Sequence, residues 1–306
     1  MSFEITTAYV QQYGTNVELM LQQRGSKLRE YVTEGEGFVG KAARPVDQIG
    51  PTEAKRKTTR HSDTPLISTP HDARWIYPED YEWADLVDKE DKLRTLIDPT
   101  SAYAINAAYA LGRSIDRMII RAALGNARTG EDGDVVVGFP AAENTMESLN
   151  RGLTVAKIRK LRTHFMKNEI DMDNDQLVIV VTAKQIEDML GYVEVTSVDY
   201  NTVKALVDGK VDTFLGFKFV QTELLPFDAD GNRTVIAWAK SGMRFGMWGS
   251  IEPKIDPRPD KSYSVQVYLR GTFGATRTDE KKVFALACDE QPISQSTALA
   301  AGSITG

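Results

Sequence analysis

A glycine-rich segment carries the closest match to a cofactor-binding motif in this sequence. Residues 35–40 read Gly-Glu-Gly-Phe-Val-Gly, which is the glycine spacing of a dinucleotide-binding loop. In that loop the last glycine opens a helix whose N-terminus binds the pyrophosphate. Pro45 follows closely and would break such a helix. We therefore interpret residues 35–40 as a bend and predict that no cofactor binds there.

The acidic and histidine residues that might bind a metal lack the required spacing. Residues 171–175 begin like a calcium-binding loop, but Gln176 stands at the glycine position and Thr182 at the position of the bidentate glutamate. We interpret this segment as a solvated turn after a helix. The sequence also holds three histidines without metal-ligand spacing, His61, His71 and His164. We therefore predict no metal site.

Signatures of covalent or hydrolytic catalysis are missing from the sequence as well. No nucleophile elbow, phosphate-binding loop or H-E-x-x-H zinc motif occurs, and Cys288 is the only cysteine. The sequence therefore predicts no catalytic residues and a protein that is not an enzyme. One alternative stays open, a mixed α/β enzyme that uses the bend at residues 35–40. Binding of a nucleotide to the chain would favour that alternative.

One dense group of cations lies in an unusual segment. Residues 41–74 contain four prolines and few large apolar side chains, so they cannot form a core of their own. Within them lies a basic cluster of Lys55, Arg56, Lys57 and Arg60. Two interpretations are open: the cluster is a solvated loop tip, or it contacts an acidic surface on a partner.

Composition and charge limit the class of protein further. The chain has 306 residues, of which 42% are hydrophobic and 26% are charged, and this is the balance of a folded protein. A net charge of −6 argues against direct binding to nucleic acid, because neutralising phosphates requires a basic excess. We expect no disulfide, no secretory signal and no transmembrane helix, and therefore a reducing cytoplasm as the setting.

A long helix is the best-defined element that could position these groups. Asp98 and Pro99 supply an N-cap and a first-turn proline, and Gly125 is expected to end the helix in a left-handed conformation. The predicted apolar face consists of Ile105, Ala108, Leu111, Ile115, Met118, Ile119 and Ala122.

Shorter elements are predicted on both sides of this helix. Apolar periodicity indicates further helices over residues 5–29, 155–167 and 182–190. Strands are expected at residues 74–77, 177–181, 216–222 and 234–239. Residues 263–273 and 282–287 are expected to close the fold as an antiparallel pair.

Four segments, taken in order, resemble the major capsid proteins of tailed bacteriophages with the HK97-like fold. Residues 6–30 (TTAYVQQYGTNVELMLQQRGSKLRE) are similar to the N-terminal arm of one capsid subfamily. Residues 58–104, from TTRHSD to PTSAYA, are similar to the end of the extended loop and the start of the long helix. Residues 214–226 (FLGFKF, then a threonine and a proline) resemble the strand-to-proline signature of the axial domain. Residues 267–288 (VYLRGTFGATRTDEKKVFALAC) are similar to the return strands of the peripheral domain.

The resemblance implies an α+β, HK97-like capsid fold with a definite order of parts. The implied divisions are an N-terminal arm at 1–37, an extended loop at 38–78, a peripheral domain at 79–175 with the spine helix at 98–126, an axial domain at 176–228, peripheral return strands at 229–290 and a C-terminal tail at 291–306.

The resemblance also implies a function. It predicts a structural protein of Caudoviricetes virions that self-assembles, as hexamers and pentamers, into an icosahedral head around double-stranded DNA. Assembly would take place in the host cytoplasm, with a portal and scaffold or decoration proteins as partners, without a membrane and without sequence-specific DNA binding. The residues proposed to contact a neighbouring subunit are those of the basic cluster, Lys55, Arg56, Lys57 and Arg60.

Two related possibilities belong with this resemblance. The same fold builds encapsulin nanocompartments, and the presence of double-stranded DNA or a portal with the shell would separate the two. Some capsids of this fold also crosslink a lysine to an asparagine. Lys41, Lys55 and Lys57 lie in the corresponding loop, but no motif supplies the asparagine and the carboxylate, so no crosslink is inferred.

Overall fold

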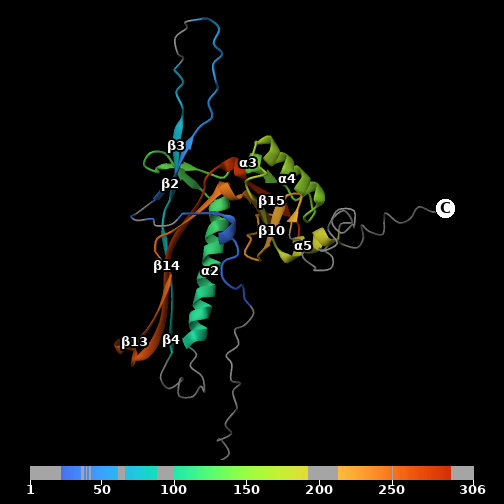
Figure 1. Ribbon diagram of the computed structural model, residues 1–306. Helices are drawn as coiled ribbons and strands as arrows, with labels where there is room; N and C mark the ends of the chain where they lie inside the picture. The colour runs from blue at the N-terminus through green and yellow to red at the C-terminus, as the bar shows by residue number, and fades with distance from the viewer. Residues whose placement is uncertain are drawn as a thin grey trace, which may run out of the picture.

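The computed structural model describes residues 22–35, 38, 40, 43–60, 66–87, 100–191, 213–249 and 251–290. A long helix lies beside a sheet of long strands, a second sheet lies on the other side of the helix among shorter helices, and a thin hairpin projects from the body (Figure 1). This combination of helices and sheets agrees with the expected α+β class. Among the described residues, no helix is long and apolar enough to cross a membrane.

The long helix predicted from the sequence is confirmed as α2 (Thr100–Leu124). Its 25 residues correspond to a length of about 37 Å. Leu111, Ile115, Met118 and Ile119 are buried, Ala122 is partly buried, and α2 packs on strands β4 and β14. Ile105 and Ala108 depart from the prediction, because both side chains are exposed. The helix is therefore packed within the subunit mainly along its C-terminal half.

The sheet beside α2 is organised around one long strand, β14. On one edge β14 pairs with β12 and β13 in succession, and on the other edge it pairs with β4 along most of its length. Strand β1 adds to the far side of β12 in parallel. The five strands are β1 (Thr33–Gly35), β4 (Glu79–Val87), β12 (Met243–Met247), β13 (Glu252–Arg258) and β14 (Ser264–Arg277).

A second sheet of six strands has the order β7-β15-β11-β8-β10-β9. Strands β8 and β11 and helices α4 and α5 lie where the sequence predicted them, and every residue of β8 is buried, as expected for a central strand. The elements are α3 (Ala141–Asn144), β7 (Thr145–Met146), α4 (Val155–Lys167), β8 (Leu177–Val181), α5 (Ala183–Leu190), β9 (Thr213–Phe214), β10 (Phe217–Gln221), β11 (Arg233–Ala239) and β15 (Val283–Cys288).

The predicted pairing of residues 263–273 with 282–287 is wrong. These residues form β14 and β15, which lie in different sheets and are joined by the 3₁₀ turn Glu280–Lys282. The turn redirects the chain because it is held by the buried polar contacts described below, and β15 then pairs with β11 instead of folding back on β14. The segment at residues 229–290 therefore supplies strands to both large sheets.

A third, small sheet carries the projecting hairpin. Its order is β2-β3-β5-β6, all antiparallel. Strands β2 and β3 are the two arms of the hairpin, which stands clear of the body in Figure 1, and β5 and β6 form its base. The strands are β2 (Ala43–Ile49), β3 (His71–Ile76), β5 (Ala127–Thr129) and β6 (Val135–Val137).

The helix predicted over residues 5–29 is wrong for the part that the structure describes. Residues 1–21 lie outside the described residues, whereas residues 22–28 are irregular and are followed by the 3₁₀ turn Arg29–Tyr31. Gly25 adopts a φ of 70°, which is incompatible with a right-handed helix. The backbone of this segment makes its hydrogen bonds with a side chain of α2 instead, as shown below.

Candidate assembly interface

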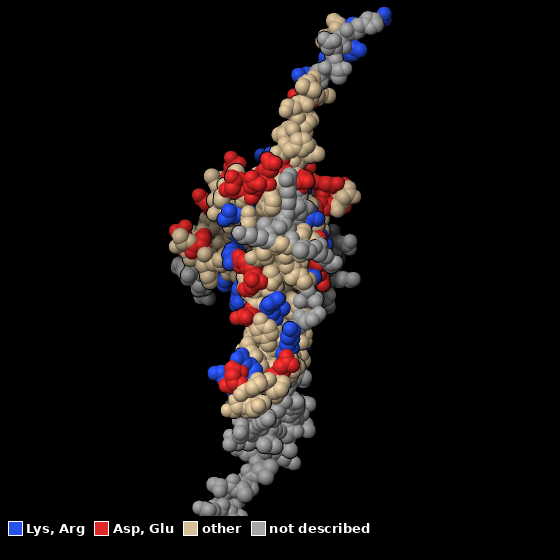
Figure 2. Space-filling model, turned by 90° about the vertical axis from the view of Figure 1, so that its left-hand side faces the viewer, with Lys and Arg blue, Asp and Glu red and all other residues tan. Residues whose placement is uncertain are grey.

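The four cations singled out in the sequence lie in the segment that follows the first arm of the hairpin, β2. Lys55, Arg56, Lys57 and Arg60 are all exposed, and the described residues around them, 51–60, are exposed as well. No ion pair to any of the four occurs within the part of the chain that the structure describes. Figure 2 shows Lys and Arg side chains on the narrow projection at the top.

Apolar side chains of the same hairpin also face solvent. Leu66 is 92% exposed and Ile49 is 68% exposed. An extended pair of strands with charged and apolar side chains in water gains little from its own packing. The hairpin is therefore suited to contact another surface.

Polar contacts at the base fix the hairpin to β5. Arg74 of β3 pairs with Thr129 of β5 in the sheet register. The Asp72 carboxylate accepts hydrogen bonds from the Thr129 hydroxyl, from the Ala73 N–H at 2.7 Å and from the Gly130 N–H at 3.1 Å. Burial alone would raise the pKa of Asp72, but these hydrogen bonds and the nearby Arg74 guanidinium together lower it. The carboxylate is therefore held in its charged form.

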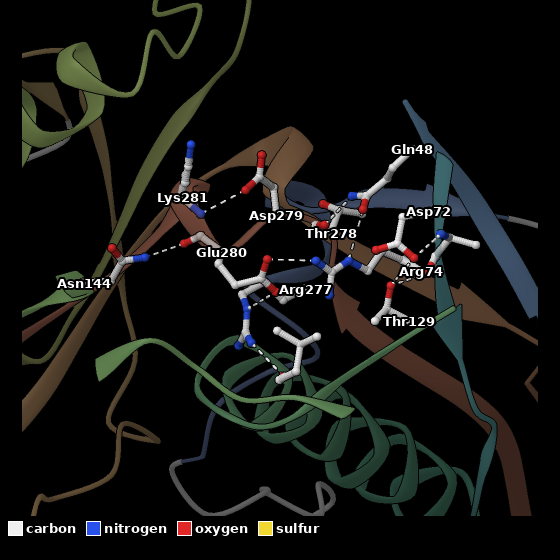
Figure 3. A network of polar contacts seen from close by, with 12 residues as sticks. Gln48, Asp72, Arg74, Thr129, Asn144, Arg277, Thr278, Asp279, Glu280 and Lys281 are labelled. Atoms are coloured by element: carbon white, nitrogen blue, oxygen red, sulfur yellow. Dashed lines mark hydrogen bonds and ion pairs between the residues drawn. The ribbon is translucent and has the colours of Figure 1, made fainter. Parts of the chain in front are cut away.

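A buried group of two arginines and one glutamate joins the hairpin to the body (Figure 3). Arg74 Nη2 lies 2.8 Å from Glu280 Oε2, and Arg277 Nε lies 3.6 Å from Glu280 Oε1. Gln48, in the opposite arm of the hairpin, accepts a hydrogen bond from Arg74 Nε at 3.3 Å and donates one to the carbonyl oxygen of Thr278. Both arms of the hairpin are thus tied to the turn between β14 and β15.

Arg277 also closes the C-terminus of the long helix. Its side chain is completely buried, and its Nη1 donates to the carbonyl oxygens of Ala123 and Gly125, each at 2.9 Å. Burial lowers the pKa of Arg277, and the neighbouring Glu280 partly offsets this. The predicted left-handed C-cap at Gly125 is wrong, since Gly125 is not among the glycines with positive φ. Arg277, which is distant in the sequence, instead donates the hydrogen bonds that satisfy carbonyl groups at the end of α2.

The N-terminal segment is attached to the middle of the same helix by Asp116. This carboxylate is completely buried in α2 and accepts hydrogen bonds from the Ser26 hydroxyl at 2.5 Å, the Lys27 N–H at 3.0 Å and the Leu28 N–H at 3.1 Å. The Gln23 amide donates to it as well. Asp116 therefore supplies acceptors for backbone groups that a helix over this segment would have satisfied internally.

The same segment crosses α2 at a glycine. A Cβ atom on Gly112 would lie 2.4 Å from the carbonyl carbon of Gly25, so only glycine permits this approach. The residue that packs closely on α2 at this point belongs to the chain's own N-terminal segment.

The sequence alone located the hairpin cations and missed the residues that position the hairpin. These are the charged residues Arg74, Arg277 and Asp116, which are buried, and Glu280, which is partly buried. A signal was present at Asp116, which directly follows Ile115 on the predicted apolar stripe. A charge at such a position indicates a buried partner.

The glycine-rich bend does not have the structure of a dinucleotide loop. Gly35 ends β1, Gly40 has a φ of 100°, and the segment that follows the bend is strand β2, where a dinucleotide loop has a helix. The positively polarised helix end that binds a pyrophosphate is therefore not formed after Gly40. Among the described residues, no group of three or more His, Cys, Asp or Glu side chains gathers as a metal site.

A long helix beside a sheet of long strands, a second sheet with shorter helices and a projecting hairpin define the class of shell-forming capsid subunits with the HK97-like fold. A sequence model of the phage capsid protein family matches residues 5–290. The chain belongs to this family of phage capsid proteins and is a structural protein of the capsid. No curated protein sequence matches it.

Solved structures of phage capsids share this fold. The capsid of cyanophage P-SCSP1u is 13% identical with a TM-score of 0.70, over 92% of this chain and 93% of that chain. The mature capsid of bacteriophage PhiM1 is 15% identical with a TM-score of 0.68, over 92% of each chain. The head of Helicobacter pylori bacteriophage KHP40 is 13% identical with a TM-score of 0.67, over 95% of this chain and 100% of that chain.

Proposed function

We propose that this capsid protein assembles, as hexamers and pentamers, into the closed icosahedral head that encloses the double-stranded DNA of a tailed phage. Assembly takes place in the host cytoplasm, with a portal and scaffold or decoration proteins as partners. The protein has no catalytic role and does not read the DNA sequence. This proposal includes the division of the chain that the resemblance implies: an N-terminal arm, an extended loop, peripheral and axial domains, return strands and a tail.

The observation that carries the proposal is the projecting hairpin. Its side chains at residues 51–60 are exposed, yet both of its arms are tied to a buried polar group at the base. A rigid attachment combined with an unburied far end favours contact with another subunit. Interfaces that hold obligate assemblies commonly bury roughly 2,000–5,000 Å², and a closed shell repeats them under symmetry.

Sedimentation of the native product tests this proposal. We expect particles in the megadalton range, seen as closed shells by negative-stain microscopy, with double-stranded DNA and a portal in those recovered from infected cells. A protein that stays monomeric under all conditions would contradict the proposal. Shells that contain enzyme cargo in place of DNA would indicate the encapsulin alternative.

Removing the charges of the basic cluster should impair assembly without impairing folding. We propose that Lys55, Arg56, Lys57 and Arg60 contact acidic groups on a neighbouring subunit. A single exposed pair is worth only about 0–1 kcal/mol, but a shell repeats each contact many times. Changing all four residues to Ala should leave the circular dichroism spectrum unchanged and raise the protein concentration needed for shells to form. Wild-type protein in high salt should show a similar defect, because salt screens the same contacts.

The low-salt behaviour of this variant decides between the two interpretations of the cluster. If the quadruple variant forms shells at the wild-type concentration in low salt, the cluster is only a solvated tip. The matched control changes four exposed cations outside the hairpin to Ala and leaves the hairpin intact: Arg159, Lys160, Lys254 and Arg270.

A further inference from the structure

The turn between β5 and β6 carries a compact group of carboxylates. Glu131, Asp132 and Asp134 lie within residues 130–134, and all three side chains are exposed. Neither a hydrogen bond nor an ion pair to these carboxylates occurs among the described residues. Figure 2 shows Asp and Glu side chains gathered on the body where the hairpin leaves it. We call these three residues the acidic turn.

The acidic turn is held in a fixed shape. Trp75 Nε1 donates to the carbonyl oxygen of Gly130 at 2.7 Å, and the Tyr77 hydroxyl donates to that of Gly133 at 3.3 Å. Gly133 has a φ of 72°, and a Cβ atom there would lie 2.7 Å from the Tyr77 hydroxyl oxygen. The carboxylates are thus displayed by a turn that two aromatic side chains support, so little ordering is needed when a partner binds.

The basic tip of the hairpin has the complementary charge and a similar size. Residues 51–60 contain one carboxylate, Glu53, and four cations, Lys55, Arg56, Lys57 and Arg60. Exposed apolar side chains accompany both groups. Leu66 lies in the hairpin, and Val135 and Val136, which are 51% and 52% exposed, directly follow the acidic turn. The two surfaces match in charge and in their apolar margins.

The basic hairpin tip and the acidic turn of the same chain cannot contact each other. The register places Trp75 opposite Arg128, so the acidic turn is fixed at the base of the hairpin. Arg60 lies ten positions after Gly50, a distance of about 33 Å along an extended chain, and the hairpin points away from the body in Figure 1. A contact between tip and turn therefore requires two copies. Because the two surfaces differ, such a contact is head-to-tail and generates a ring when the rotation closes.

We propose that the acidic turn, Glu131, Asp132 and Asp134, is the surface on which the basic hairpin tip of a second copy of this chain docks. The proposal rests on the proposed assembly into a shell and names the acceptor of the hairpin. Arg128 adjoins the acidic turn, but its guanidinium carbon lies over the ring of Tyr77, 5.0 Å from the ring centroid. It forms no ion pair with the three carboxylates among the described residues.

A charge swap within one chain tests the docking. The tip variant carries Lys55→Glu, Arg56→Glu, Lys57→Glu and Arg60→Glu, and the turn variant carries Glu131→Lys, Asp132→Lys and Asp134→Lys. Each alone places like charges together, so we expect the concentration needed for assembly, measured by sedimentation in low salt, to rise at least about tenfold. A chain carrying both sets restores opposite charges and should assemble near the wild-type concentration.

A control variant separates this effect from a change in net charge. Glu143→Lys, Glu147→Lys and Asp173→Lys alter the same number of exposed carboxylates outside the turn and should assemble like wild type. Circular dichroism establishes that every variant is folded. Wild-type assembly of the turn variant, or a combined chain no better than the tip variant, would overturn the docking while leaving shell formation intact. Failure of the wild-type chain to form particles would instead overturn the proposed function.

Discussion

Replacing Arg277 with Met should lower the free energy of unfolding by about 3–5 kcal/mol, the range found when one partner of a buried ion pair is removed. Methionine fills most of the volume but cannot donate to the carbonyl oxygens of Ala123 and Gly125. Glu280 would also lose one of its two guanidinium partners in a buried setting. The change therefore acts on the helix end, the turn before β15 and the hairpin base together.

Urea denaturation followed by circular dichroism measures this loss. Arg270→Met is the matched control, because Arg270 lies in the same strand with an exposed side chain, and its substitution should change stability by no more than about 0.5 kcal/mol. Equal stabilities of the two variants would show that the buried arginine does not hold the end of α2.

Replacing Asp116 with Ala should cost a similar amount, about 3–5 kcal/mol, and should release the N-terminal segment. The backbone N–H groups of Lys27 and Leu28 would lose the acceptor that holds them against α2. Leu28 is completely buried, so release of the segment also exposes apolar surface. We expect limited proteolysis to cut the variant between residues 22 and 32 under conditions in which the wild type resists.

The neighbouring residue supplies the control for this prediction. Arg117→Ala lies one position further along α2 on the exposed side and should leave both stability and proteolysis unchanged. Asp116→Asn keeps the shape and one acceptor, so its loss of stability should fall between those of the wild type and Asp116→Ala. Resistance of Asp116→Ala to proteolysis would contradict the attachment.

Local signals were sufficient for elements with regular apolar spacing or an uninterrupted buried run, although the predicted C-cap at Gly125 is wrong and the predicted N-cap at Asp98 and Pro99 lies outside the described residues. Asp98, Pro99 and the regular apolar spacing predicted α2, and the uninterrupted β-branched run of β8 predicted a buried strand. The long-range pairing of β14 was not predictable, because its partners β4, β12 and β13 are chosen by tertiary packing and not by any neighbouring turn. For the same reason the expected pair of residues 263–273 and 282–287 failed.

The candidate interface was predictable in part for a related reason. Cations in a segment without a core are visible in the sequence, and the structure leaves Lys55, Arg56, Lys57 and Arg60 exposed between the two arms of the hairpin. Their buried support is not visible, because Arg74 and Arg277 read as ordinary surface charges until the fold brings Glu280 between them. The sequence near Arg277 therefore gives no sign that this arginine binds the end of α2.

The hydrogen bonds from Arg277 to the end of α2 can form only after most of the chain has been synthesised. The arginine lies 154 residues after Ala123, whose carbonyl oxygen it binds. At roughly 5–20 residues per second, synthesis of that interval takes roughly 8–30 s. During that time the helix lacks its final hydrogen-bond donor, and β11 lacks its partner β15. A chain that ends before residue 277 should therefore remain protease-sensitive in residues 100–124. The native contacts at the end of α2 and along β11 therefore cannot be complete in a subunit whose last strand, β15, has not yet been synthesised.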